Sequence, residues 1–132
     1  RGCMARKPDI RPWVYKAEED YRAALTLARK RKDPVPDNVC FSAQQCVEKY
    51  LKAFLVHHRK GFPKTHDLAE LLKIALAVDP LLEVIRPNLR ELLPYAVAFR
   101  YPGEEATTEE SRRAVLAMKN VRELLRERLG LT

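Results

Sequence analysis

Apolar side chains recur at helical spacing along most of the chain, starting just after Pro12. In this first stretch they fall three and four residues apart from Val14 to Ala28, which predicts an amphipathic helix with one apolar face. The proline-rich sequence DPVPDN then ends the pattern, because proline cannot continue a helix. Asp37 or Asn38, at the end of that loop, is placed to cap a second helix.

The second helix has the most regular apolar stripe. Most apolar residues of FSAQQCVEKYLKAFL, residues 41–55, fall on one face, which predicts a helix central to the core. Gly61 and Pro63 end this helix. Thr65 is the predicted N-cap of a third helix, HDLAELLKIALAV, whose leucines form another apolar face.

Prolines interrupt the fourth helix. Asp79 followed by Pro80 is a cap with proline at the first helical position, so this helix is predicted to begin near Leu81. Pro87 and Pro94 each remove a backbone donor and clash with the preceding turn. The fourth helix is therefore expected to be kinked or divided into two short helices.

The last helix opens on a capping-box pattern formed by Thr107 and Glu110, and its apolar stripe ends before Gly130. No stretch alternates with a period of two for long enough to predict a strand. Short connections between successive helices predict antiparallel neighbours. The fold class expected is all-α, an antiparallel up-and-down bundle of four main helices plus a short or kinked fifth.

The composition is that of one globular domain. The 132 residues are 46% hydrophobic and 33% charged and include only four glycines, a balance typical of a compact helical protein. We expect an N-terminal tail over residues 1–11 and a single domain over residues 12–130. Cys3 precedes Met4 in the opening RGCM, which is consistent with residues 1–3 being a cloning remnant.

Charge and cysteine usage restrict the partner and the compartment. With 25 Lys and Arg against 18 Asp and Glu, the net charge of +7 favours an acidic partner such as a nucleotide, a nucleic acid or an acidic protein. A solvated basic surface is the simpler alternative. Three cysteines without paired spacing predict free thiols in a cytoplasmic protein, with Cys40 and Cys46 filling the core. No apolar run approaches the ~20 residues that span a bilayer, so no membrane association is expected.

Alternating helix directions would bring the corner at residues 57–66 and the corner at residues 100–107 to one end of the bundle. Basic side chains and two helix N-termini would meet there, and both favour anions. In this hypothesis a phosphate-binding site is formed by six residues: Lys49, Lys52, Lys64, His66, Arg100 and Tyr101. The tyrosine would stack on a base, and the five other side chains would contact phosphate.

Each candidate also has a purely structural interpretation. Glu48 and Lys52 have the spacing of a surface salt bridge, and Arg100 is placed to interact with the end of a helix. A catalytic interpretation remains open as well, because Arg59 and His66 could act as a metal-independent ribonuclease pair. The imidazole would move protons while the guanidinium holds the phosphate. Neither a metal nor a cofactor is predicted, since the adjacent His57 and His58 cannot easily share an ion with a third ligand.

Four segments together resemble the HEPN domain, over residues 13–128: DYRAALTLA, FSAQQCVEKYLKAFL, PKTHDLAELL and AFRYPG. The resemblance implies a helical bundle that forms homodimers and binds nucleotides beside a minimal nucleotidyltransferase partner, in a prokaryotic toxin–antitoxin-like system. Many HEPN relatives are ribonucleases with Arg, four to six residues, then His near the start of a late helix. Here Arg100 is followed by YPGEEATTEES, which contains no histidine.

The leading hypothesis is therefore a non-catalytic, cytoplasmic HEPN module that binds a nucleotide or RNA phosphate and acts with a nucleotidyltransferase. The alternative is a metal-independent endoribonuclease that uses Arg59 and His66. A second alternative is a structural interaction subunit without nucleotide binding.

Overall fold

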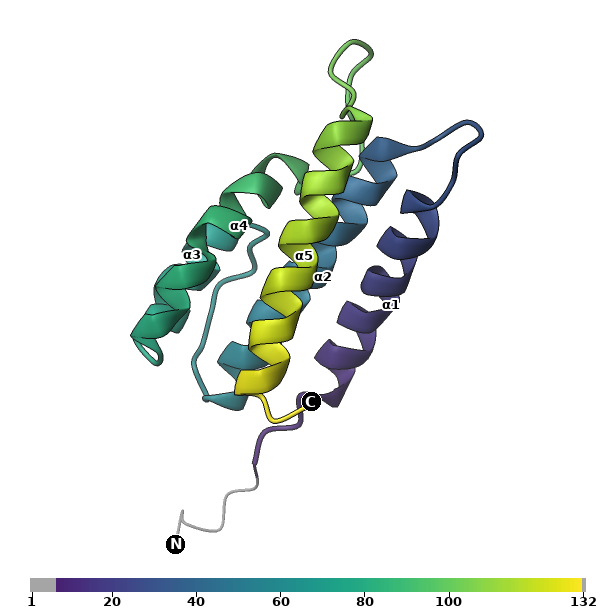
Figure 1. Cartoon of the computed structure of the whole chain (residues 1–132). Helices are drawn as coiled ribbons and strands as arrows, with labels where there is room; N and C mark the ends of the chain where they lie inside the picture. The colour runs from purple at the N-terminus through teal and green to yellow at the C-terminus, as the bar shows by residue number, and fades with distance from the viewer. Residues whose placement is uncertain (1–6, 132) are drawn as a thin grey trace, which may run out of the picture.

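The computed structural model describes residues 7–131, and all regular structure in that range is helical (Figure 1). The five α-helices are α1 (Arg11–Ala28), α2 (Pro36–His57), α3 (Leu68–Leu76), α4 (Arg86–Leu92) and α5 (Thr108–Arg128). Two short 3₁₀ helices flank α4, namely η2 (Pro80–Ile85) and η3 (Leu93–Tyr95). The predicted all-α class is confirmed, and the described residues contain no strand.

The central helix is α2, as its stripe predicts. It packs against α1, α5 and α3, and nearly all of its residues from Val39 to Leu55 are buried. The large side chains of Tyr50 and Phe54 fill the interior on one face of the helix, and that of Leu51 is buried on a neighbouring face. Burial on several faces is what a helix surrounded by other helices requires.

Both cysteines of α2 are buried free thiols, as predicted. Burial raises the pKa of Cys40 to about 11, and burial raises the pKa of Cys46 even further. Cys3 and the expected remnant at residues 1–3 lie outside the described residues.

The predicted start of the last helix and the division of the fourth are confirmed. The Thr107 hydroxyl accepts from the Glu110 N–H at 3.0 Å, and the Glu110 carboxylate accepts from the Thr107 N–H at 2.8 Å. Pro87 lies in the first turn of α4 and Pro94 in the first turn of η3, so each proline begins a new helix. Asp79 caps η2 as expected, accepting from the backbone of the second residue after it.

The cap of α2 differs from the prediction. Val35 occupies the N-cap position and makes no side-chain capping bond, while Asp37 lies inside the first turn. The Asp37 carboxylate instead accepts from the backbone N–H of Ala106 at 2.6 Å. An acidic residue in the first turn still suits the helix dipole, and here it also joins the start of α2 to the segment before α5.

The cap of α3 is Asp67 rather than the predicted Thr65. The Asp67 carboxylate accepts from the Ala69 N–H at 2.9 Å. Two residues earlier in the chain, the Thr65 hydroxyl accepts from the Asp67 N–H at 3.0 Å. Two successive side-chain bonds therefore fix the entry to this helix, and the sequence pattern indicated only the first of them.

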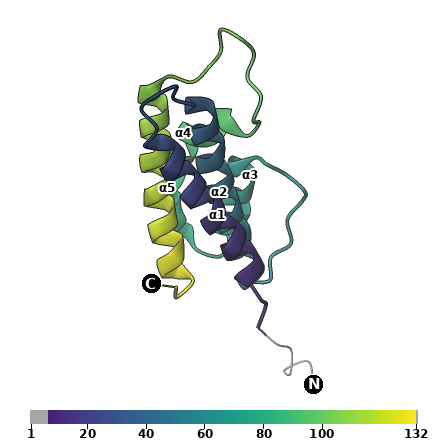
Figure 2. The ribbon, with the colours of Figure 1, turned by 90° about the vertical axis from the view of Figure 1, so that its right-hand side faces the viewer.

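Helix directions depart from strict alternation at α3. The segment of residues 58–67 does not turn at the end of α2 but returns along it, so α3 begins beside the middle of α2 and runs in the same direction (Figures 1 and 2). As a result α4 runs back, and α5 starts at the end where α2 starts, next to Asp37. Residues 57–59 and residues 100–107 therefore lie at opposite ends of the bundle (Figure 1).

A partly buried ion pair joins α1 to α5. The Arg122 guanidinium donates two hydrogen bonds to the Glu18 carboxylate, at 2.7 and 2.8 Å, and the Tyr50 hydroxyl donates to the same carboxylate. Arg126 donates to the Tyr50 oxygen at 2.9 Å. The hydrogen bonds from Arg122 hold the pKa of Glu18 below its ordinary value despite its partial burial.

Candidate functional site

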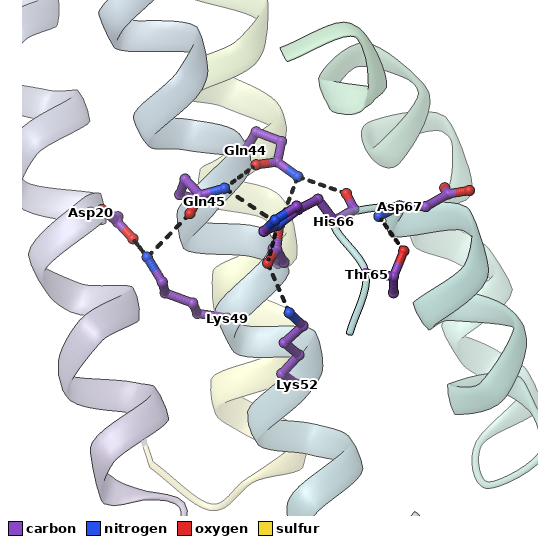
Figure 3. A network of polar contacts seen from close by, with 9 residues as sticks. Asp20, Gln44, Gln45, Lys49, Lys52, Thr65, His66 and Asp67 are labelled. Carbon is purple, nitrogen blue, oxygen red and sulfur yellow. Dashed lines mark hydrogen bonds and ion pairs between the residues drawn. The ribbon is translucent and has the colours of Figure 1, made fainter. Parts of the chain in front are cut away.

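The predicted site residues that do come together surround the Glu48 carboxylate on α2 (Figure 3). This side chain is only 4% exposed. It accepts from Lys52 Nζ at 2.9 Å and from Gln44 Nε2 at 3.2 Å, and it contacts His66 Nδ1 at 3.0 Å. Residues four apart share one face of a helix, which is why α2 presents all three of its members to the returning segment.

Burial alone would raise the pKa of Glu48. Hydrogen bonds from Lys52, His66 and Gln44 outweigh that effect and lower the pKa below its ordinary value. The carboxylate is therefore ionised at neutral pH and satisfied by donors on several sides.

Lys52 belongs to the interior rather than to a surface groove. Its side chain is 9% exposed, and Nζ lies 5.8 Å from the ring centroids of both Trp13 and Phe62. The i,i+4 pair with Glu48 suggested by the sequence is present, but it is buried instead of exposed. Such a lysine is engaged by a carboxylate and by two aromatic rings, so a direct contact with phosphate would require it to leave this environment.

His66 is the exposed member of the cluster. Its side chain is 69% exposed, while its backbone carbonyl accepts from Gln44 Nε2 at 3.2 Å. Because Nδ1 faces the Glu48 carboxylate, that contact favours a proton on Nδ1 and leaves Nε2 on the opposite edge of the ring. An imidazole oriented by a buried carboxylate can bind an anion when protonated or accept a proton when neutral.

Lys49 and Lys64 are the two other lysines of the predicted site. Lys49 Nζ contacts Asp20 Oδ2 of α1 at 2.5 Å and Gln45 Oε1 at 3.4 Å, so it is held away from the imidazole (Figure 3). Lys64 is exposed, lies two residues before His66 and forms no ion pair within the described residues. The cation available beside His66 is therefore Lys64 rather than Lys49 or Lys52.

Arg100 and Tyr101 lie away from this cluster, in the loop before α5 at the end of the bundle where α2 begins. Arg100 Nη1 donates to the Pro94 carbonyl at 2.7 Å, and its Nε donates to the Glu104 carbonyl at 3.3 Å. Its guanidinium also lies 5.6 Å from the Tyr95 ring centroid. These contacts make Arg100 a clamp for the loop before α5, and the expected joint site of Arg100 and His66 is not formed.

Arg59 and His66 lie at different heights along the axis of α2. Arg59 follows the last turn of α2 in a left-handed conformation with φ of 56°. His66 is level with Glu48, which is eleven residues earlier, or roughly 16 Å along a helix axis. Their separation of seven positions in sequence therefore does not place the two backbones side by side.

Sequence reasoning missed three partners of this cluster: Gln44, Trp13 and Phe62. The role of Gln44 could have been predicted from one signal. The helix predicted to be central contains three polar residues at four-residue spacing, namely Gln44, Glu48 and Lys52. Buried polar side chains need partners, so such a row predicts a polar segment packed against it. Nothing in the spacing identified the two aromatic rings.

The match to known families decides what kind of domain this is. The family model of the HEPN domain matches residues 10–128, nearly the whole chain. The chain belongs to the HEPN family. The resemblance seen in its sequence motifs is thus confirmed, and a HEPN domain supports a role connected with nucleotides or RNA. No curated protein and no solved structure matches the chain.

Among residues 7–131 no helix is long and apolar enough to cross a membrane. The same residues contain no group of three or more His, Cys, Asp or Glu side chains arranged to hold a metal ion.

Proposed function

We propose that this HEPN domain is a non-catalytic module that binds a phosphate group of a nucleotide or RNA beside His66. The observation that carries the proposal is the exposed imidazole held at Nδ1 by the buried Glu48 carboxylate. A carboxylate in this position fixes the ring, so little conformational freedom is lost when an anion binds.

The charge balance around the imidazole suits an anion. Glu48 and Lys52 neutralise each other inside the cluster, so the positive charge left beside the exposed imidazole is that of Lys64. A phosphate oxygen would accept from the His66 Nε2–H and from Lys64 Nζ. Lys49 and Lys52 then act by holding α2 in place, not by contacting the ligand.

Calorimetric titration with ATP, GTP and a 12-nucleotide RNA tests the proposal. We expect His66→Ala and Lys64→Ala each to weaken binding about tenfold, since each removes one charge-assisted hydrogen bond. His57→Ala is a matched control, because it removes a histidine at the end of α2 that makes no contact with Glu48. Undiminished binding in His66→Ala, or no heat with any ligand, would contradict the proposal.

The partner expected from HEPN relatives is a minimal nucleotidyltransferase, in a prokaryotic toxin–antitoxin-like system in the cytoplasm, with the chain itself forming a homodimer. Large apolar side chains exposed on the surface support protein–protein contacts: Leu81, Val84, Val97 and Leu116. Light scattering would give the mass of the chain alone. Co-purification with a nucleotidyltransferase encoded beside it would test the partner.

A metal-independent endoribonuclease is the second candidate, because a carboxylate-oriented imidazole is also the arrangement of a general base. It predicts cleavage of single-stranded RNA in EDTA that is lost in His66→Ala, reduced in Glu48→Gln and retained in His57→Ala. Loss of cleavage in Arg59→Ala would show that the Arg59 guanidinium also takes part in the reaction. A chain that neither binds nor cleaves these ligands, yet forms a dimer or a complex, would be a structural interaction subunit.

A further inference from the structure

A basic groove lies at the end of the bundle where α1 ends and α5 begins. Its volume is about 610 Å³. One wall is the connection after α1, including Arg29, Lys30 and Arg31, and the other is the first two turns of α5, including Arg112. Val115 contributes an apolar patch to its lining.

Most of the positive charge of this groove has no acidic partner among residues 7–131. Within the described residues, the side chains of Arg29 and Arg31 form no ion pair, and Lys30 donates only to the Lys32 carbonyl. Arg112 has one carboxylate nearby, Glu109 at 3.5 Å.

Two arginines of the helical bundle outside the groove are paired with acids at shorter distance. Arg122 lies 2.7 Å from Glu18, and Arg128 lies 2.8 Å from Asp79. A run of four basic residues, 29–32, without comparable acidic partners therefore gives this end of the molecule a concentrated positive field.

An exposed pair of aromatic rings lies at the same end. Phe99 and Tyr101 are 67% and 68% exposed, and their rings pack edge to face with centroids 5.1 Å apart. They belong to the loop that leads into α5 and projects from this end (Figure 1). Arg100 holds the base of that loop through two backbone carbonyls, and Ala106 ties the loop to the start of α2.

We propose that this end of the domain binds single-stranded RNA, with the phosphate backbone in the groove and bases against the Phe99–Tyr101 pair. Cationic grooves that follow the backbone, with aromatic faces for unpaired bases, are the usual combination for single strands. A duplex would not expose base faces to these rings. The site is separate from the His66 cluster, and the inference does not depend on phosphate binding there.

Fluorescence anisotropy with a labelled 12-nucleotide RNA at several salt concentrations tests the groove. We expect the double variant Arg29→Gln, Arg31→Gln to bind about tenfold more weakly at moderate salt. Its salt dependence should fall by about 1.4 in the slope of log K against log salt, at about 0.7 for each lost phosphate contact on a single strand. Both residues follow the last residue of α1, so circular dichroism should show unchanged helicity.

The matched control is Lys73→Gln, Arg90→Gln, which removes the same charge from exposed positions of α3 and α4. Its affinity and slope should stay close to those of the unchanged chain. An equal loss in the control would show that net charge alone attracts the RNA and would overturn the groove assignment. Unchanged binding in the Arg29, Arg31 variant would overturn it as well.

Inorganic polyphosphate separates phosphate contacts from base contacts. The variant Phe99→Ala, Tyr101→Ala should bind the RNA at least about fivefold more weakly but bind polyphosphate as before, because only the RNA offers bases for stacking. Undiminished RNA affinity in this variant would overturn the assignment to single strands, because the RNA would then be bound through phosphate contacts alone. Weaker binding in the Arg29, Arg31 variant with unchanged binding in His66→Ala would support the groove and contradict the His66 site, and the reverse result would contradict the groove alone.

Discussion

At the level of single residues, the least expected feature of this domain is a row of polar side chains in its central helix. Gln44, Glu48 and Lys52 are all buried, yet each has a hydrogen-bond partner. Their common function in the fold is to hold the returning segment against α2 through His66. The polar row thus has a structural role whether or not a ligand binds beside it.

Replacing Glu48 by Ala should destabilise the domain by about 3 kcal/mol, because the change leaves Lys52 buried without its carboxylate. Urea unfolding followed by circular dichroism would measure the loss. Glu109→Ala is the control, since its arginine partners are exposed and such pairs contribute little. A Glu48→Ala variant as stable as that control would show that Lys52 reaches solvent at little cost.

The sequence suggested Glu48 and Lys52 as a pair but placed them on the surface. Spacing identifies which residues share a helix face, but it does not reveal what covers that face. Here the covering comes from Trp13 at the start of α1 and Phe62 after α2, both distant in sequence from the pair. The expected i,i+4 salt bridge is present but buried, and phosphate binding by Lys52 stays a prediction.

At the level of helices, local signals predicted most of the boundaries. Pro87, Pro94 and the Thr107–Glu110 box act through their own backbone neighbours, so their effects could be expected from sequence. Asp37 behaved differently, because its partner Ala106 comes from a distant segment. Capping rules therefore predict a helix boundary correctly when the side chain and its backbone partner are close in sequence.

Thr107→Ala should lower the free energy of unfolding by about 1 kcal/mol, because the first turn of α5 loses its side-chain cap. Thermal or urea unfolding would detect the change. Thr108→Ala is a close control, since that neighbour is exposed and its carbonyl, not its hydroxyl, is the group that accepts from Ser111. Equal losses in both variants would mean that the capping box contributes no stability of its own.

At the level of the whole molecule, the directions of the helices could not be predicted from connection lengths. The ten residues between α2 and α3 are enough either to turn or to run back along a helix. Gln44 donates to the His66 carbonyl and the Glu48 carboxylate accepts from the His66 ring, and these two bonds favour the second course. Because the segment runs back, Arg100 lies at the opposite end of the bundle from residues 57–59. The residues of the predicted phosphate-binding site therefore lie in two separate regions.

Distances between spin labels can check this arrangement. With Cys3 replaced by Ser, labels at His58→Cys and Glu104→Cys should lie on the order of 30 Å apart, because they occupy opposite ends of the 22-residue helix α2. Labels at Lys32→Cys and Glu104→Cys should be much closer, since both loops lie at the end where α2 begins. A short first distance would favour strict alternation of helix directions.

Low pH should destabilise the whole bundle, because it protonates the partly or fully buried carboxylates of Glu18 and Glu48. The pKa values of Glu18 and Glu48 are lowered in the folded state, so these groups stabilise the fold above their ordinary pKa of 4.5 and lose that contribution as the pH falls. We expect the free energy of unfolding to decline below about pH 4.5. Glu18→Gln should show a shallower decline, whereas Glu123→Gln, an exposed position without an ion pair, should not.

The buried thiols of α2 give the domain an intrinsic reporter of how often its centre opens. The thiolate is the form that attacks thiol reagents, and in the closed bundle Cys40 and Cys46 are both buried and have raised pKa values that leave little thiolate. In a Cys3→Ser background, modification of either residue should therefore proceed only through opening. Its rate under native conditions would measure the fraction of molecules in which α2 has separated from its neighbours.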